Sequence, residues 1–379
     1  MKKIKVLIIT GTMNMGGIEN QLMHLLRNSD PTKFQIDFTS TLKDPYYRSE
    51  IEALGGRCIL IPEMKKSNPY PYCRCLYNLM KHEQYDIVHS HELFHSGIVL
   101  WVAAMAKVPG RFVHAHNWQD GVGDGKKRPF IREIYNRVMR KMIRRYSTHQ
   151  LACSTLAAKF LYGDSIITEP SYHLIVNSVD TAKFLDDYDK PEFGEFCDDW
   201  INILQVGRVT PVKNQLFLTE IADIFRQRNK HIRILCAGAG DKDYEEKIQQ
   251  TISEKGLDNY IKMLGPRDDI ASLMRKSSAF VLPSHYEGMP LVVIEAQASG
   301  LPCVCADTFS HEVELTDGSI RWISLHEPAH VWADSLETAV TQERAKKELV
   351  QHQIAEKGFD SKTFAKSLCA LYSNVVTEL

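Results

Sequence analysis

Ser284-His-Tyr-Glu-Gly-Met-Pro-Leu-Val-Val-Ile-Glu-Ala-Gln-Ala-Ser-Gly-Leu-Pro-Cys303 follows a short apolar run, Ala279-Phe-Val-Leu-Pro283. The apolar run is rich in strand formers, whereas Leu291 to Ser299 shows helical periodicity. The segment therefore predicts a strand, a loop and a helix in succession. Repetition of such units builds α/β folds with a parallel sheet.

The loop between the predicted strand and helix carries groups that suit a phosphorylated sugar. Gly288 and Pro290 shape the bend and leave backbone N–H groups unpaired where the helix begins, and such a terminus favours an anion. Glu295 lies about one turn into the helix, where its carboxylate can accept two hydrogen bonds from a vicinal diol such as that of a ribose. Glu287 lies on the strand side of the bend. Phosphate and sugar can therefore be held together here.

The two glutamates stand eight positions apart within E-G-M-P-L-V-V-I-E-A-Q-A-S-G-L-P. A bare pair of glutamates is common on surface helices, but here Gly288, Pro290, Gly300 and Pro302 accompany it. The whole pattern resembles the signature of family 4 retaining glycosyltransferases. The resemblance implies the GT-B fold, an α/β architecture in which two Rossmann-like, doubly wound domains face a central cleft. It also implies that this segment binds the sugar donor, through Glu287, Gly288, Met289, Pro290, Leu291 and Glu295.

Length and composition fit such a protein. A chain of 379 residues is too long for one ordinary core, and 44% hydrophobic with 25% charged residues is typical of a soluble globular protein. No apolar run approaches the roughly 18 residues of a membrane-spanning helix, and Met1-Lys-Lys-Ile-Lys5 leads into a strand, unlike a signal peptide. We therefore expect a cytoplasmic protein, which a lipid-linked acceptor would bring to the inner face of the cell membrane.

Cysteine spacing argues against a metal site. The nine cysteines are odd in number and scattered, which favours reduced thiols over a disulfide framework. Cys73-Arg-Cys75 and Cys303-Val-Cys305 lack the spacing and histidine partners of a zinc site. Asp187-Tyr-Asp189 matches the D-x-D pattern of metal-dependent glycosyltransferases of another fold, but it lies in an expected linker and is interpreted as a chance match. We expect no metal and no other cofactor.

Charge is distributed unevenly along the chain. Residues 1–180 hold 24 Lys and Arg against 16 Asp and Glu, which leaves 22 against 31 for residues 181–379. The basic half contains a predicted amphipathic helix at 126–146, which could lie on an anionic membrane or cover the core with a solvated basic side. Both alternatives make this face cationic. The chain shows no nucleic-acid-binding motif, and its sequence pI is about 6.9, so we expect no nucleic-acid partner.

In the first half of the chain, predicted strands alternate with segments of helical length, as in a doubly wound sheet. Lys5 to Thr10 is an apolar strand, and the glycine-containing loop that follows opens a helix at Ile18. Gly16 and Gly17 resemble the family's glycine-rich loop that approaches donor phosphate and acceptor, with a plain turn as the alternative. Further strands are expected at Phe34 to Thr39, Cys58 to Ile61, Asp86 to His89, Arg111 to His114 and His149 to Ala152.

Two histidine pairs end predicted strands, in Asp86-Ile-Val-His-Ser-His91 and Phe112-Val-His-Ala-His116. The carboxyl ends of strands face the ligand crevice in open α/β sheets. By the resemblance, His116 takes the place of a histidine that contacts the transferred sugar, whereas His89 and His91 can equally be structural and His114 a core or capping residue. The strand pleat is expected to keep the four from converging on a metal.

The second half repeats the pattern. Ile201 to Val206 leads into Gly-Arg208-Val-Thr-Pro-Val-Lys213, which resembles the family's G-R-x-x-x-x-K motif. Arg208 can donate hydrogen bonds to two phosphate oxygens at once, and Lys213 can add a second positive charge. Both would stabilise the negative charge of a departing diphosphate. Gly238 gives weak evidence of phosphate contact or serves tight packing, and the resemblance places the nucleotide base near Pro266 and Arg267.

The resemblance also divides the chain. It implies an acceptor-side domain at 1–182, a linker at 183–199 and a nucleotide-sugar domain at 200–360, with a final helix at 361–379 crossing back onto the first domain. The apolar face of that helix suits this packing.

Taken with these motifs, the resemblance implies a retaining hexosyltransferase. The donor would be a nucleotide diphosphate sugar, UDP-hexose or UDP-N-acetylhexosamine, and the acceptor a saccharide, lipid-linked in surface polysaccharide synthesis. Arg208, Lys213, Glu287 and His116 would act in transfer. Two alternatives remain: a non-catalytic nucleotide-sugar-binding scaffold of the same fold, and an enzyme of that fold with other chemistry, such as a sugar-nucleotide epimerase or a phosphorylase.

Overall fold

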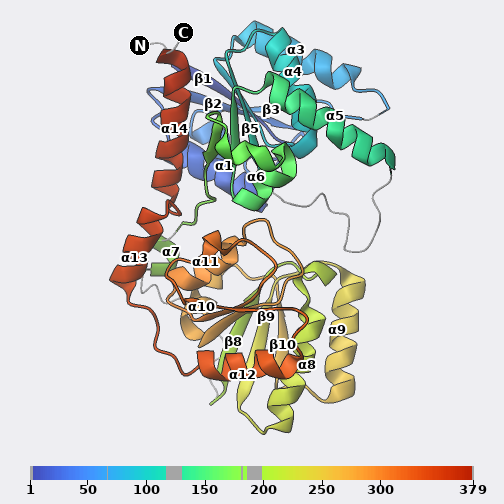
Figure 1. The fold of residues 1–379 in the computed structure, drawn as a ribbon, viewed down its shortest axis with the longest axis vertical. Helices are drawn as coiled ribbons and strands as arrows, with labels where there is room; N and C mark the ends of the chain where they lie inside the picture. The colour runs from blue at the N-terminus through green and yellow to red at the C-terminus, as the bar shows by residue number, and fades with distance from the viewer. Residues whose placement is uncertain (1–2, 66, 117–129, 181, 186–198, 378–379) are drawn as a thin grey trace. The chain divides into compact units, whose positions relative to one another are not determined.

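The computed structural model describes residues 3–65, 67–116, 130–180, 182–185 and 199–377. The chain divides into two compact units. Unit 1 comprises Met1–Ser178 with Asp360–Leu379, and unit 2 comprises Val179–Phe359. Figure 1 shows a sheet with flanking helices in each unit.

Unit 1 is built on a seven-stranded sheet in the order β3-β2-β1-β4-β5-β6-β7. Every neighbouring pair is parallel. The strands are β1 (Ile4–Ile9), β2 (Phe34–Ser40), β3 (Cys58–Leu60), β4 (Ile87–Ser90), β5 (Gly110–Ala115), β6 (His149–Ala152) and β7 (Tyr172–Leu174). The helices are α1 (Gly17–Asn28), α2 (Arg48–Ala53), α3 (Tyr70–Glu83), α4 (Ser96–Met105), α5 (Phe130–Tyr146), α6 (Thr155–Tyr162) and α14 (Ser361–Thr377).

Alternate residues of the strands bury both faces of this sheet. In β1, Val6 and Ile8 pack with side chains of α1 and α14, whereas Leu7 and Ile9 pack with side chains of α3 and α4. Both sets are fully buried. Such continuous apolar strands are typical of parallel sheets covered on two sides.

Unit 2 is built on a six-stranded parallel sheet in the order β10-β9-β8-β11-β12-β13. Its strands are β8 (Ile201–Val206), β9 (Ile232–Ala237), β10 (Ile261–Gly265), β11 (Ala279–Leu282), β12 (Cys303–Ala306) and β13 (Ile320–Ile323). Its helices are α7 (Ala182–Leu185), α8 (Gln215–Gln227), α9 (Lys242–Lys255), α10 (Ile270–Lys276), α11 (Leu291–Ala298), α12 (Ala329–Ala339) and α13 (Lys347–Glu356).

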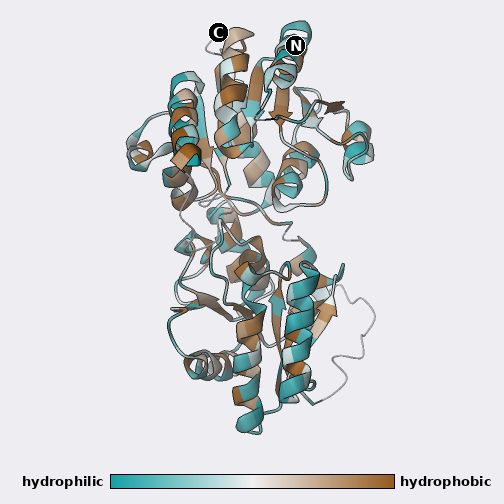
Figure 2. Ribbon diagram, turned by 90° about the vertical axis from the view of Figure 1, so that its right-hand side faces the viewer, coloured by the Kyte–Doolittle hydropathy of each residue, from teal (hydrophilic) through white to brown (hydrophobic). Residues whose placement is uncertain are grey.

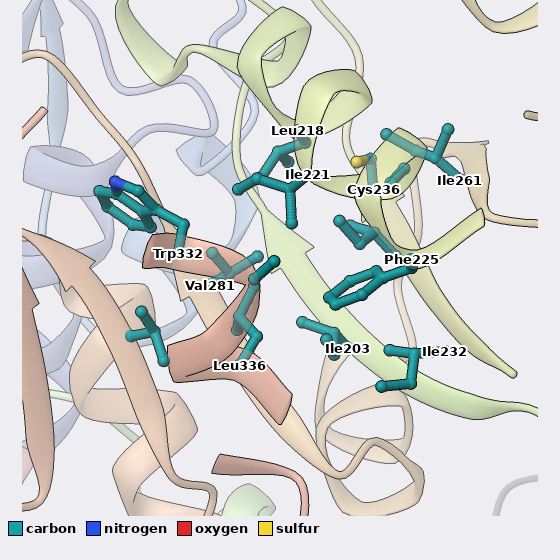
Figure 3. Close-up of a cluster of buried hydrophobic side chains, with 14 of the residues drawn as sticks. Ile203, Leu218, Ile221, Phe225, Ile232, Cys236, Ile261, Val281, Trp332 and Leu336 are labelled. Atoms are coloured by element: carbon teal, nitrogen blue, oxygen red, sulfur yellow. The ribbon is translucent and has the colours of Figure 1, made fainter. Parts of the chain in front are cut away.

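The core of unit 2 joins its central strands to three helices, α8, α9 and α12. Figure 3 shows Phe225 of α8 and Trp332 of α12 among aliphatic side chains from the strands. In Figure 2 the helices carry hydrophilic and hydrophobic residues side by side, as expected when one face of each helix packs on a sheet.

Both sheets have the doubly wound strand order, which confirms the predicted fold class. The order reverses between β1 and β4 in unit 1 and between β8 and β11 in unit 2. Ligands of such sheets bind outside the carboxyl ends of the strands at this reversal. Two loops in each unit therefore require closer description.

Candidate active site

The two loops at the strand reversal of unit 2 are joined by their backbones. One follows β8 and contains a short 3₁₀ turn at Pro211–Lys213, and the other follows β11 and leads into α11. The backbone N–H of His285 donates to the carbonyl of Val212 over 2.8 Å. Two motifs far apart in the sequence thus form one surface at the place expected for a ligand.

Lys213 and Glu287 form an ion pair across these loops. Lys213 Nζ lies 2.5 Å from Glu287 Oε1, and the two side chains are only 16% and 13% exposed. Limited access of water makes this pair stronger than a typical surface pair. The exposed side chain of Arg208 lies in the same loop as Lys213. Unit 2 therefore brings these three predicted residues to one edge of its sheet.

Sequence reasoning missed Gln205 beside this pair. Its side chain is fully buried, and neither its amide oxygen nor its amide nitrogen has a partner among the described residues. A Cβ placed on Gly207 would lie 3.4 Å from Gln205 Nε2 and 3.2 Å from Lys213 Cε, so the two side chains flank the same glycine. The sequence does contain a sign of this residue, because Gln205 is a polar side chain inside the apolar strand Ile201–Val206.

Gly238 holds the next loop tightly against the first. A Cβ at Gly238 would lie 2.0 Å from the carbonyl oxygen of Gly207, and its φ of +144° is in any case unfavourable for other residues. The Gly238 N–H donates to the carbonyl of Gly265 over 2.8 Å. The tight-packing alternative for Gly238 is therefore sufficient to explain why a glycine stands there.

A hollow of about 300 Å³ lies at the ends of β9 and β10. Its lining comprises Gly238, Glu245, Glu246, Gln249, Met263 and Gly265. Pro266, where the nucleotide base was expected, follows directly after Gly265 and is exposed. The Arg267 guanidinium is held by Asp269 at 2.8 and 2.9 Å. The backbone at 265–267 is thus fixed next to this hollow.

The beginning of α11 matches the expected anion-binding turn. Pro290 is the N-cap residue and no side chain caps the first turn, while Met289 and Pro290 are buried and Gly288 and Leu291 are half-buried. Glu295 lies one turn further along and is half-buried. Desolvation raises the pKa of its carboxyl to about 7, and nearby Lys183 acts against this rise.

The glycine loop of unit 1 leads from β1 into α1. Gly16 is the N-cap of the helix in an extended conformation and supplies no side-chain cap. A Cβ on Gly16 would meet only the flexible carboxylate of Glu19, and a Cβ on Gly17 would have no atom within 4 Å. The internal geometry of unit 1 therefore gives no reason for glycine at position 17.

His89 on β4 and His114 on β5 lie beside His91 and His116, which directly follow these strands. The expectation that the pleat keeps the histidines apart was wrong for three of them, because nitrogens of His89, His91 and His114 lie within 4.8 Å of one another. Residues two apart on a strand share one face, and parallel pairing aligns His89 with Phe112, which places His91, His114 and His116 beside it. Ring centroids of His89 and His91 lie 4.2 Å apart, and those of His114 and His116 lie 4.3 Å apart. Burial lowers the pKa of all four imidazoles, that of His116 to about 4.

Helix α5 exposes the apolar residues that sequence reasoning could have assigned to the core. Phe130 is 75% and Ile131 81% exposed, and Ile134 and Val138 are each 46% exposed. The helix buries Asn136, Met139 and Ile143 instead. No helix of the described residues is both long and apolar enough to cross a membrane. Residues 126–129 of the predicted basic segment, and Asp187 and Asp189 in the expected linker, lie outside the described residues.

Comparisons with known proteins agree with this arrangement. The family profile "Glycosyl transferases group 1" matches residues 190–357, and the profile "Glycosyltransferase Family 4" matches residues 15–183. The putative glycosyltransferase EpsF of Bacillus subtilis is 34% identical over 383 aligned residues, which cover 99% of this chain and 97% of EpsF. The chain belongs to glycosyltransferase family 4.

Two other relatives of this glycosyltransferase have names that refer to saccharides. The capsular polysaccharide biosynthesis glycosyltransferase CapH of Staphylococcus aureus is 29% identical over 77% of this chain and 78% of CapH. The UDP-Gal:alpha-D-GlcNAc-diphosphoundecaprenol alpha-1,3-galactosyltransferase of Escherichia coli is 30% identical over 61% of this chain and 60% of its own.

The solved structure of another protein has the same fold as this glycosyltransferase. Anabaena Alr3699/HepE in complex with UDP-glucose matches 99% of this chain and 100% of its own, with a TM-score of 0.75 at 17% identity. Together with the two doubly wound units, this match confirms the GT-B fold.

Proposed function

We propose that this glycosyltransferase moves a hexose or N-acetylhexosamine from a UDP-sugar to a lipid-linked saccharide in surface polysaccharide synthesis, with retention of anomeric configuration. The observation that carries the proposal is the ion pair of Lys213 and Glu287 at the strand reversal of unit 2, next to the uncapped turn before Glu295. Cations and hydrogen-bond donors at one edge of a sheet are what a departing nucleoside diphosphate needs.

Each group has a distinct role in this proposal. Arg208 and Lys213 neutralise the diphosphate, and Glu287 orients the Lys213 ammonium group and contacts sugar hydroxyls. Glu295 accepts hydrogen bonds from the ribose, and N–H groups of Gly288, Met289 and Leu291 hold phosphate or sugar oxygens, with Pro290 setting the turn. The hollow beside Gly238, Pro266 and Arg267 holds the base. Gly16, Gly17 and His116 of unit 1 contact the donor sugar and acceptor.

Two known proteins support the choice of donor and acceptor. The Escherichia coli relative uses UDP-Gal and a saccharide on diphosphoundecaprenol, and HepE was crystallised with UDP-glucose. The exposed apolar and basic residues of α5 support an approach to the membrane that holds such an acceptor.

The test begins with the donor. Purified protein is screened with UDP- and GDP-sugars for thermal stabilisation, since a ligand at 100 times its dissociation constant adds roughly 2.7 kcal/mol. The stabilising donor is then used to measure release of nucleoside diphosphate with a lipid-linked saccharide. Lys213→Ala is expected to lower turnover by about 10²- to 10³-fold, because it removes a preorganised charge from the leaving group.

Controls separate this proposal from its alternatives. Lys247→Ala on the exposed side of α9 should leave turnover unchanged. A protein that binds the donor but releases no diphosphate with any acceptor would be a scaffold, and conversion of the donor without an acceptor would indicate an epimerase. An inverted anomeric centre in the product, read by NMR coupling constants, would contradict retention.

A further inference from the structure

The histidine cluster of unit 1 consists of the buried residues His89, His91, His114 and His116. Several of its ring nitrogens have no close hydrogen-bond partner among the described residues. Nε2 of His89, Nε2 of His91 and the ring nitrogens of His114 make no short hydrogen bond within the part of the chain that the structure describes. The backbone of Ile175 lies close enough to raise the pKa of His114 through a hydrogen bond, and the Asn177 side chain does the same for His116. The four side chains are between 0% and 9% exposed. A buried polar group without a partner carries a desolvation cost of about 1–3 kcal/mol. A metal ion that accepts one lone pair each from His89, His91 and His114 would remove that cost at these three residues.

Two hydrogen bonds determine which lone pairs are available. His89 Nδ1 lies 2.7 Å from the hydroxyl oxygen of Tyr372 in α14, and His91 Nδ1 lies 2.7 Å from His116 Nε2. When each Nδ1–H donates in these contacts, Nε2 of His89 and Nε2 of His91 keep their lone pairs. Histidines that bind metals almost always donate their other ring N–H in this way, which fixes the tautomer and the ring orientation.

We propose that His89, His91 and His114 bind one divalent transition-metal ion, Zn²⁺ in the first instance. Nitrogen donor atoms of these three residues all lie within 4.8 Å of one another. A tetrahedral ion with Zn–N distances of about 2.0–2.1 Å holds its ligands about 3.4 Å apart, so ring rotations on binding complete the geometry. A water molecule takes the fourth position.

The chemistry of the donor set selects the class of ion. Three neutral imidazoles without a carboxylate suit zinc, cobalt, nickel or copper, and they suit magnesium and calcium poorly. The ion would join β4 to β5 and, through His89 and Tyr372, also secure α14 to the sheet. Its role would be to stabilise unit 1.

Metal content of the full-length protein tests this proposal. The protein is prepared without a polyhistidine tag, stripped with a chelator, reloaded with Zn²⁺ or Co²⁺ and dialysed. We expect one equivalent by mass spectrometry, visible Co²⁺ ligand-field bands of tetrahedral intensity, and a thermal midpoint that rises on reloading. These readouts need neither donor nor acceptor, so they are independent of glycosyl transfer.

Matched variants locate the ion. His114→Gln removes a ligand but keeps a side-chain amide that can hydrogen-bond to the nearby backbone of Ile175, and it should lower metal affinity at least 100-fold. Tyr372→Phe removes only the orienting hydroxyl and should lower affinity by about 10- to 100-fold. His173→Gln, on β7 of the same sheet, should bind as the wild type does. Absence of bound metal and of ligand-field bands, undiminished binding by His114→Gln, or equal loss in His173→Gln would each overturn the proposal.

Discussion

At the scale of single residues, substitution of Gly17 tests whether glycine is needed there for packing or for function. Its Cβ position is open and it begins α1, so Gly17→Ala should leave stability unchanged or raise it by up to about 1 kcal/mol. If backbone and ligand approach each other closely here, turnover should fall by an order of magnitude or more. Urea unfolding and a diphosphate-release assay measure the two effects.

Gly11→Ala is the control for this substitution, because position 11 in the same loop is also sterically open. Wild-type turnover is expected for it. Undiminished turnover of Gly17→Ala would remove Gly17 from the site.

Glu295 gives a prediction about pH. Its folded-state pKa of about 7 exceeds the ordinary value of 4.5, so the folded protein binds more protons between these pH values than the unfolded chain does. Stability contributed by this group is therefore present at low pH and lost as pH rises through 7, by up to about 3 kcal/mol. Urea unfolding of the ligand-free protein at pH 5.5 and pH 8 should show this loss.

Glu295→Gln should lack that component of the pH dependence, since the amide does not titrate. Glu220→Gln, at an exposed position of α8, should keep it. Identical pH profiles for the wild type and Glu295→Gln would contradict the assignment.

The motifs predict that Lys213 and Glu287 share a site, yet their ion pair could not be derived from the sequence. The two residues are 74 positions apart, and their contact depends on β8 and β11 being neighbours in the sheet. The histidine convergence depends in the same way on the register of β4 with β5. Residue type and spacing reveal candidate groups, whereas strand order and register decide which of them meet.

At the scale of elements, continuous apolar runs predicted most strands well. Ile201–Val206 and His149–Ala152 have the expected bounds. The edge strand Tyr172–Leu174 was missed, because three half-exposed or exposed residues produce no apolar run. Helix α5 was ambiguous because its apolar residues could face either the core or a membrane, and only packing shows that Asn136, Met139 and Ile143 face inward.

The exposed side of α5 predicts binding to anionic membranes. Phe130 and Ile131 can insert at the lipid interface while Arg137 and Lys141 on exposed positions face headgroups. Ile131→Glu should lower affinity for phosphatidylglycerol vesicles about tenfold or more, because a buried isoleucine contributes roughly 1.5–3 kcal/mol. Cosedimentation at low and high salt measures this affinity.

Leu349→Glu in α13 is the control for α5, because this leucine is 47% exposed and belongs to unit 2. It should bind vesicles as the wild type does. Equal loss of binding in both variants would show that the effect is not specific to α5.

At the scale of the whole molecule, the last helix belongs to the first core. Helix α14 follows unit 2 in the chain, yet Phe364, Leu368, Tyr372 and Val375 are buried in the core of unit 1. It packs beside α1, as Figure 1 shows. Unit 1 therefore cannot complete its core until the entire chain has been made, whereas unit 2 consists of one continuous segment.

This connectivity predicts that a change in α14 weakens one unit only. Leu368→Ala should destabilise unit 1 by about 2–5 kcal/mol, because it leaves a cavity in the core that α14 shares with α1 and β1. Hydrogen exchange should accelerate in β1 and β4 and stay unchanged in β8 and β11. Lys366→Ala, two residues earlier on the exposed side of the helix, should change stability by less than about 0.5 kcal/mol. Equal acceleration in β8 would mean that the two units unfold together, so that the loss of α14 packing also destabilises unit 2.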